Sequence, residues 1–66
     1  MIITLNGGSA EVADGTTVAD LITGLTGSAR GSAAVVDGEV VPRSSWPLTL
    51  LREGQSVELI TAVQGG

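Results

Sequence analysis

A single amphipathic stripe is the feature that most limits the folds open to this chain. The stripe recurs at positions i, i+3, i+4 and i+7 and consists of Val18, Leu21, Ile22 and Leu25. Thr17 followed by Asp20 forms a capping-box pattern, so we expect a helix over residues 18–26, ended by Gly27. One helix cannot bury its own apolar stripe, and the remainder of the chain must supply the surface that covers it.

The rest of the chain has the patterning of short strands separated by turns. Strands are expected at residues 1–5, 9–13, 33–36, 39–41 and 56–63. Asn6-Gly7 and Asp37-Gly38 predict tight hairpin turns, because these residues tolerate positive φ. Pro42 ends the fourth strand, and Pro47 argues against a long helix over residues 43–51. This order predicts an α+β fold of the β-grasp pattern, a mixed sheet of four to five strands covered on one face by a single helix.

The 66 residues suffice for one domain, whose core must be built by packing alone. There is no cysteine for a disulfide and no histidine for a zinc site, but 42% of the residues are apolar. We expect residues 1–63 to form the domain and residues 64–66 a flexible tail. Residues 1–5 are apolar without the basic flank of a signal peptide, and no apolar run approaches the roughly 20 residues that span a bilayer. A cytoplasmic protein is the expectation.

The net charge and the absence of several residue types argue against some classes of function. The net charge of −4 repels nucleic-acid phosphates and anionic lipids, and one Trp without Phe or Tyr offers no platform for stacking bases. We therefore expect neither nucleic acid nor membrane as a partner, and favour a protein with a basic docking surface. The chain also lacks His, Cys, Lys and Tyr, which removes the usual nucleophiles and general bases. We expect no catalytic residues and no metal site.

The sequence ends in Gly65-Gly66. Taken alone, a diglycine is equally compatible with a frayed terminus of no function. Here it comes directly after the last predicted strand, which we expect to be central in the sheet. That placement, on a predicted β-grasp pattern whose relatives use this ending, favours a function for the carboxylate of Gly66.

Segments along nearly the whole chain match one known family. They are Asn6-Gly7, Gly15-Thr16-Thr17-Val18, Leu21, Ala34-Val35-Val36, Val40-Val41-Pro42-Arg43-Ser44, Trp46, Leu51, Gly54, Val57-Glu58 and Ala62-Val63-Gln64-Gly65-Gly66. On these residues the chain resembles the thiamin-biosynthesis sulfur carriers, the ThiS family of ubiquitin-like β-grasp proteins. It departs from the family at Gln55, where an acidic residue is usual, at Pro47 and at Gly24. These departures concern local geometry rather than function.

The resemblance implies that Gly66 is the site of sulfur attachment. A partner adenylating (activating) enzyme would use ATP to convert the carboxylate into an acyl-adenylate, and sulfur from a persulfide, brought by a sulfur-transfer enzyme, would displace AMP. The C-terminal thiocarboxylate would then deliver sulfur to thiazole synthase. Gly65, Gln64 and Val63 would pass into the partners' active sites. The chain itself would be a carrier rather than an enzyme, with no stably bound cofactor.

Candidate docking residues follow from the alternation in the last strand. Ile60 and Ala62 fall on the face opposite Val57 and Leu59, where an apolar surface beside Glu58 would suit a partner's groove. The alternative, that these apolar side chains belong to the core, has equal weight at this point.

Other conspicuous residues have structural interpretations. Trp46 is expected to pack in the core rather than to anchor an interface, and Arg43 to pair with Glu39 on the surface. Asp14, Asp20 and Asp37 are interpreted as turn and cap residues.

Three alternatives to a thiazole sulfur carrier stay open. A carrier resembling the small subunit of molybdopterin synthase shares the fold and the diglycine end, although residues 41–46 favour the thiazole pathway. A ubiquitin-like modifier joined to target lysines through Gly66 would use the same activation chemistry. A plain interaction module would make no use of the tail.

Overall fold

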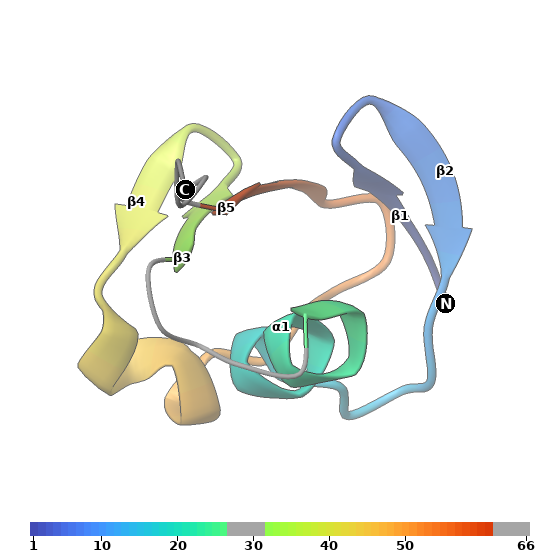
Figure 1. The fold of residues 1–66 in the computed structure, drawn as a ribbon. Coiled ribbons are helices and arrows are strands. Elements are labelled where there is room, and N and C mark those ends of the chain that lie inside the picture. The colour runs from blue at the N-terminus through green and yellow to red at the C-terminus, as the bar shows by residue number, and fades with distance from the viewer. Residues whose placement is uncertain (27–31, 62–66) are drawn as a thin grey trace.

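The computed structural model describes residues 1–26 and 32–61, in which one α-helix covers one face of a five-stranded sheet (Figure 1). In chain order the elements are β1 (Ile2–Leu5), β2 (Gly8–Glu11), α1 (Val18–Thr26), β3 (Ser32–Val36), β4 (Glu39–Val41), the 3-10 helix η1 (Arg43–Leu48) and β5 (Ser56–Thr61). The predicted α+β fold and its element order are confirmed. Gly27, the expected helix stop, and the expected domain boundary at residue 63 lie outside the described residues.

The C-terminal strand β5 occupies the middle of the sheet. The strand order is β2-β1-β5-β3-β4, with β5 parallel to β1 and antiparallel to β3. Figure 1 shows the two antiparallel hairpins, β1–β2 and β3–β4, on either side of β5, so that the sheet arches over α1. The expectation that the last strand is central is therefore confirmed, and the sheet is mixed.

Both hairpins close through turns whose two central residues have positive φ. The values are 49° and 83° at Asn6 and Gly7, and 50° and 84° at Asp37 and Gly38. Two successive residues with positive φ define a type I′ turn, whose twist matches that of the flanking strands. The turn predictions made from these two dipeptides are thus confirmed.

The N-terminus of α1 is capped as its sequence indicates. The backbone N–H of Asp20 donates to Oγ1 of Thr17, and the backbone N–H of Thr17 donates to Oδ2 of Asp20, both over 3.1 Å. Two amide groups that the helix leaves without partners are satisfied in this way.

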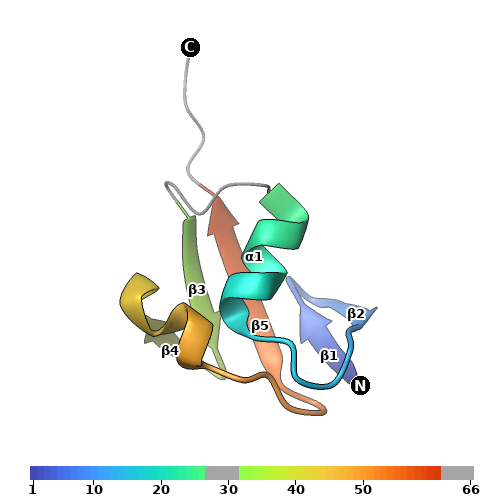
Figure 2. The ribbon, with the colours of Figure 1, turned by 90° about the horizontal axis from the view of Figure 1, so that it is seen from below.

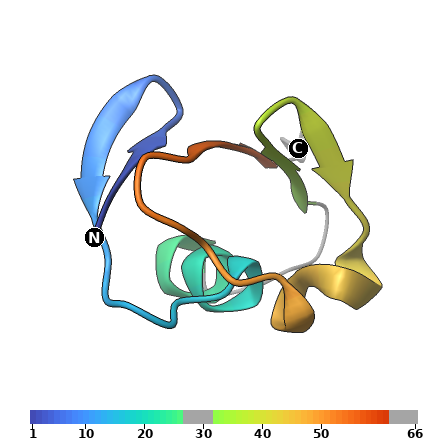
Figure 3. The same ribbon diagram turned by 180° about the vertical axis from the view of Figure 1, so that it is seen from behind.

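Backbone hydrogen bonds also join the start of α1 to the segment after η1. Val18 N–H donates to the Thr49 carbonyl over 3.0 Å, and Leu51 N–H donates to the Thr16 carbonyl over 2.9 Å. In Figure 3 this segment passes across the start of α1 on its way to β5. The helix is therefore held at its first turn by main-chain bonds as well as by its apolar stripe.

The core lies between the sheet, α1 and η1. Its buried residues are Ile3, Val18, Leu21, Ile22, Ala34, Val36, Trp46, Leu51 and Val57. Trp46 is 3% exposed, and its indole N–H donates to the Val41 carbonyl over 2.8 Å. The interpretation of Trp46 as a packing residue is confirmed.

Two expectations about side chains are wrong. Leu25, the last residue of the predicted stripe, is 56% exposed. The segment after η1 is hydrogen-bonded to the start of α1, and in Figure 2 η1 lies beside the first turn of the helix rather than beside its last turn. The guanidinium carbon of Arg43 lies 5.9 Å from the centroid of the Trp46 ring, and within the described ranges no ion pair joins it to Glu39. The face of the Trp46 indole attracts the Arg43 guanidinium electrostatically, and it therefore competes with the Glu39 carboxylate for this side chain.

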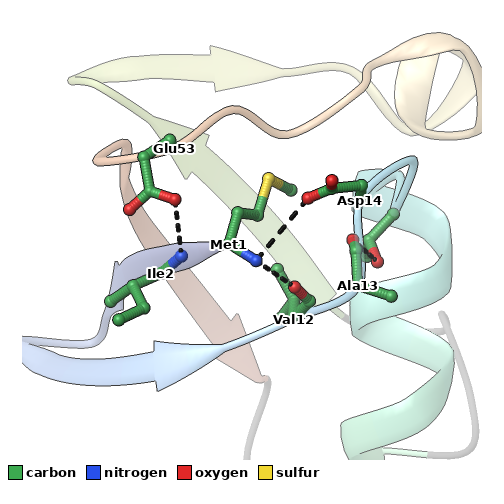
Figure 4. Close-up of polar contacts among 7 residues, drawn as sticks. Met1, Ile2, Val12, Ala13, Asp14 and Glu53 are labelled. Atoms are coloured by element: carbon green, nitrogen blue, oxygen red, sulfur yellow. Dashed lines mark hydrogen bonds and ion pairs between the residues drawn. The ribbon is translucent and has the colours of Figure 1, made fainter.

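Figure 4 shows the hydrogen bonds and the ion pair that the first two residues make with other parts of the chain. The ammonium group of Met1 donates to the Val12 carbonyl over 2.8 Å and lies 3.6 Å from a carboxylate oxygen of Asp14. Ile2 N–H donates to Glu53 over 3.1 Å, which links β1 to the turn before β5. Asp14, which was expected to be a turn residue, therefore also forms an ion pair with the N-terminus.

Candidate functional site

The residues expected to carry the chemistry follow directly after the central strand. The last described residue is Thr61, at the end of β5. Gly66, the expected sulfur attachment site, lies outside the described residues, as do Gly65, Gln64 and Val63 and the docking candidate Ala62. The described part of the site is therefore the strand that leads to these residues and the surface beside it.

Strand β5 is bonded along both edges at its start. On the β1 side, Thr4 N–H donates to the Gln55 carbonyl over 2.8 Å, and Asn6 N–H donates to the Val57 carbonyl over 2.9 Å. On the β3 side, the register runs without a break from Val36 opposite Val57 to Ser32 opposite Thr61. Strand β5 is therefore paired on both sides over its first residues, and on the β3 side as far as Thr61.

Two turn side chains add bonds to β5 that a sequence pattern does not show. Oδ1 of Asn6 accepts the Leu59 N–H over 2.8 Å, and Oδ1 of Asp37 accepts the Ser56 N–H over 3.0 Å. The two turns lie on opposite sides of β5, so the strand is bound from both edges by turn side chains as well as by its neighbours. Their sequences, Asn-Gly and Asp-Gly, indicated the turns but not these contacts.

The face of the sheet away from α1 carries the two docking candidates that the structure describes. Ile60 is 55% exposed and Glu58 is exposed, while their neighbour Val57 is fully buried, as strand alternation requires. The interpretation of Ile60 as a core residue is thereby ruled out. Ile60 and Glu58 are surface residues of the strand that leads to the chain end.

Sequence reasoning missed a further member of this surface. Val40 is 71% exposed on the edge strand β4, and half-buried Val35 lies between it and Glu58 in the register of the sheet. We call Val35, Val40, Glu58 and Ile60 the outer patch. The sequence could have indicated Val40 only through the alternation of residues 39–41. Three residues are too few to assign a side chain to one face of a strand.

No pocket is detected in the described fold, and residues 1–26 and 32–61 contain no group of three or more Asp, Glu, His or Cys side chains that could hold a metal ion. Among these same residues, no helix has the length and apolarity needed to cross a membrane. What the described part of the chain presents is a surface and a central strand leading to the chain end.

Comparisons with known proteins agree with this architecture. The model of the ThiS family matches residues 3–66. The sulfur carrier protein ThiS of Escherichia coli is 29% identical over 66 residues, which cover 100% of both chains. The crystal structure of a thiamine biosynthesis protein (ThiS) from Geobacter metallireducens is 29% identical, covers 100% of both chains and superposes with a TM-score of 0.83.

An NMR solution structure of a thiamine biosynthesis protein from Geobacter metallireducens gives the same result. It is 27% identical, the match covers 100% of this chain and 88% of the other, and the TM-score is 0.80. The family match extends over both the described fold and the diglycine residues. This chain therefore belongs to the ThiS family and has its ubiquitin-like β-grasp fold.

Proposed function

We propose that this protein is a sulfur carrier of thiamin biosynthesis that bears sulfur on the carboxylate of Gly66. The observation that carries the proposal is the family match over residues 3–66, which includes the diglycine, on a fold whose central strand leads to it. The Escherichia coli relative that aligns over its full length is a sulfur carrier protein. A chain without His, Cys, Lys or Tyr has few other groups with which to act.

The carboxylate must be activated before it can take up sulfur. A C-terminal α-carboxyl group ordinarily has a pKa of about 3.3–3.7, so it is ionised at neutral pH and is a poor electrophile. An adenylating partner joins one carboxylate oxygen to the α-phosphate of ATP and releases pyrophosphate. The terminal sulfur of a persulfide on a sulfur-transfer enzyme then attacks the carbonyl carbon, AMP leaves, and a thiol reduces the remaining sulfur–sulfur bond. The product is a C-terminal thiocarboxylate, the sulfur donor for thiazole synthase.

In this scheme all catalysis belongs to partner enzymes in the cytoplasm, and the carrier is their shared substrate. It needs no resident cofactor, since ATP is consumed by the activating enzyme. Glycine has no Cβ, so Gly65 and Gly66 can enter a narrow channel and let partner groups approach the reacting carbon. Four extended residues, Val63 to Gly66, span at most about 13–14 Å, enough to reach an active site while the body of the carrier stays outside.

We assign the first docking contact, with the activating enzyme, to the outer patch. Its apolar members Ile60 and Val40 are 55% and 71% exposed, and Ala62 follows Ile60 at the next outward position of the strand pattern. The carboxylate of Glu58 and the net charge of −4 match a partner groove that is apolar at its centre and basic at its rim. Such docking offsets the conformational entropy lost when the tail is held, about 1–2 kcal/mol per residue.

Intact-mass analysis of the protein from thiamin-starved cells tests the proposal. We expect a species in which one oxygen has been replaced by sulfur, located at Gly66 by fragmentation, and absent from a Gly66→Val variant. Covalent adducts with other proteins would instead identify a modifier. Co-purification with a larger molybdopterin synthase subunit would identify the other pathway, and an unmodified carboxylate under all conditions would refute sulfur carriage.

A further inference from the structure

The parallel pairing between β1 and β5 stops before β5 ends. The register pairs Thr4 with Ser56 and Leu5 with Val57, after which the β1 chain turns away at Asn6. On the opposite edge, β3 stays paired with β5 as far as Thr61. The last part of β5 therefore has a neighbouring strand on one side only.

Asn6 extends the β1 side of the ladder by one more bond. Its backbone N–H donates to the Val57 carbonyl over 2.9 Å, and its side-chain Oδ1 accepts the Leu59 N–H over 2.8 Å. In a continuing parallel strand the acceptor for Leu59 would be a main-chain carbonyl. Here φ at Asn6 is +49° and the chain reverses through Gly7, so the side-chain oxygen stands in for that carbonyl.

We propose that Asn6 is a positioning residue for the carrier's C-terminal segment. Its side-chain acceptor holds Leu59, two residues before the last described residue of the strand, to the β1 edge, and so orders the end of β5, from which the sequence continues to Gly66. The inference rests on the proposed function, because the order of this strand end matters for charging only if partner enzymes act on the residues beyond it. No partner contact of Asn6 itself is invoked.

Asp37 provides the matched comparison. It is also the first central residue of a type I′ turn, with φ of +50°, and its Oδ1 accepts a β5 amide, that of Ser56, over 3.0 Å. Ser56, however, begins β5, whereas Leu59 lies near its end. Removing either acceptor costs an exposed side-chain to main-chain bond, and Asp37→Gly also loses the bond that Gln55 Nε2 donates to Oδ2 of Asp37 over 3.2 Å. Only the Asn6 bond lies close to the residues that partners must reach.

The experiment compares Asn6→Gly, Asp37→Gly and Asn6→Asp in the full-length chain. Glycine keeps the positive φ and removes the acceptor, whereas aspartate tolerates positive φ and restores an acceptor. The first readout is amide exchange and ¹⁵N relaxation by NMR, without any partner. In Asn6→Gly we expect exchange of the Leu59 amide to rise by about tenfold or more, and order parameters at Ile60 and Thr61 to fall. Asp37→Gly should loosen Ser56 and leave the end of the strand unchanged.

The second readout is charging by the activating enzyme with ATP. Asn6→Gly should lower kcat/KM by about fivefold to thirtyfold, the factor expected if roughly one residue must be ordered anew at each encounter. Asp37→Gly should leave kcat/KM unchanged, and Asn6→Asp should restore most of it. Equal values for wild type and Asn6→Gly, or an equal loss in Asp37→Gly, would overturn the positioning role.

The two readouts also separate this inference from the proposed function. A wild-type chain that is never charged would refute sulfur carriage, while the NMR readout would still decide whether Asn6 orders the end of β5. Unchanged order parameters at Ile60 and Thr61 in Asn6→Gly would refute the positioning role even if charging proceeds normally.

Discussion

Replacing Trp46 with phenylalanine decides whether this side chain serves the core or a partner interface. Trp46 is 3% exposed, and its indole N–H donates to the Val41 carbonyl over 2.8 Å. Phenylalanine removes that bond, a net contribution of about 0.5–1.5 kcal/mol. It also leaves a void where the second ring was, which costs a further 1–2 kcal/mol, roughly, on the scale of other large-to-small core changes. The free energy of unfolding should fall by about 1.5–3.5 kcal/mol.

For a domain of this size, each kcal/mol corresponds to roughly 4–8 °C, so the midpoint temperature of unfolding should fall by about 6–28 °C. The assay is thermal unfolding followed by far-ultraviolet circular dichroism, because the variant lacks the chain's one tryptophan. Leu48→Ala is the control, since Leu48 lies in the same 3-10 helix but is 83% exposed, and it should shift stability by less than about 0.5 kcal/mol.

A second measurement distinguishes packing from recognition. At a temperature where Trp46→Phe is fully folded, its affinity for the activating enzyme should equal that of wild type. Unchanged stability together with weakened binding would refute the assignment of Trp46 to the core and make it an interface residue.

Four further substitutions, and Thr23→Ala as a control, test local features of the fold by thermal unfolding. Thr17→Ala should cost about 1 kcal/mol by removing the helix cap, whereas Thr23→Ala on the exposed side of the same helix should not destabilise, and equal losses would contradict the capping role. Gly24→Ala should stabilise by about 0.8–1 kcal/mol, because an added Cβ meets no atom within 4 Å in the helix interior. Gly7→Ala, equally uncrowded but at φ of +83°, should destabilise by roughly 1–2 kcal/mol; the same sign for both glycines would contradict the account. Asp14→Asn should change stability by less than about 0.5 kcal/mol despite the ion pair with the Met1 ammonium, since the Asp14 side chain is 94% exposed; a larger loss would show that this contact is structural.

Much of the fold could be predicted because local patterns and the final packing agree. The capping box at Thr17 and Asp20, the two positive-φ turns and the alternation of Val57 with Glu58 each depend on neighbours close in sequence. These local patterns predict the final structure correctly because the tertiary contacts favour the same conformations.

The wrong or missed features depend on residues far apart in the chain. Leu25 has the spacing of a core residue, yet its burial depends on where η1 packs along the helix, which periodicity does not encode. Arg43 has both a carboxylate and an indole ring as sequence neighbours, and only the folded chain shows that it lies over Trp46. The bond from Leu59 to Asn6 joins residues 53 positions apart and could not be inferred from either segment alone.

For the site, the sequence left Ile60 with equal weight as a docking residue beside Glu58 or as a core residue, and the structure shows that both Ile60 and Glu58 are exposed on β5. It did not indicate Val40, because a three-residue edge strand is too short to show its own alternation. The role of Gly66 rests on family membership and on chemistry, and stays a prediction for experiment.

Growth without added thiamin is the most direct test of the central claim that this chain acts through its C-terminal carboxylate. The gene would be placed in cells that lack their own carrier but retain the partner enzymes, as wild type and with the codon for Gly66 deleted. Wild type should restore growth, and the deletion variant should not, although both proteins accumulate to the same level and unfold at the same temperature. Restored growth with the deletion variant would contradict the account.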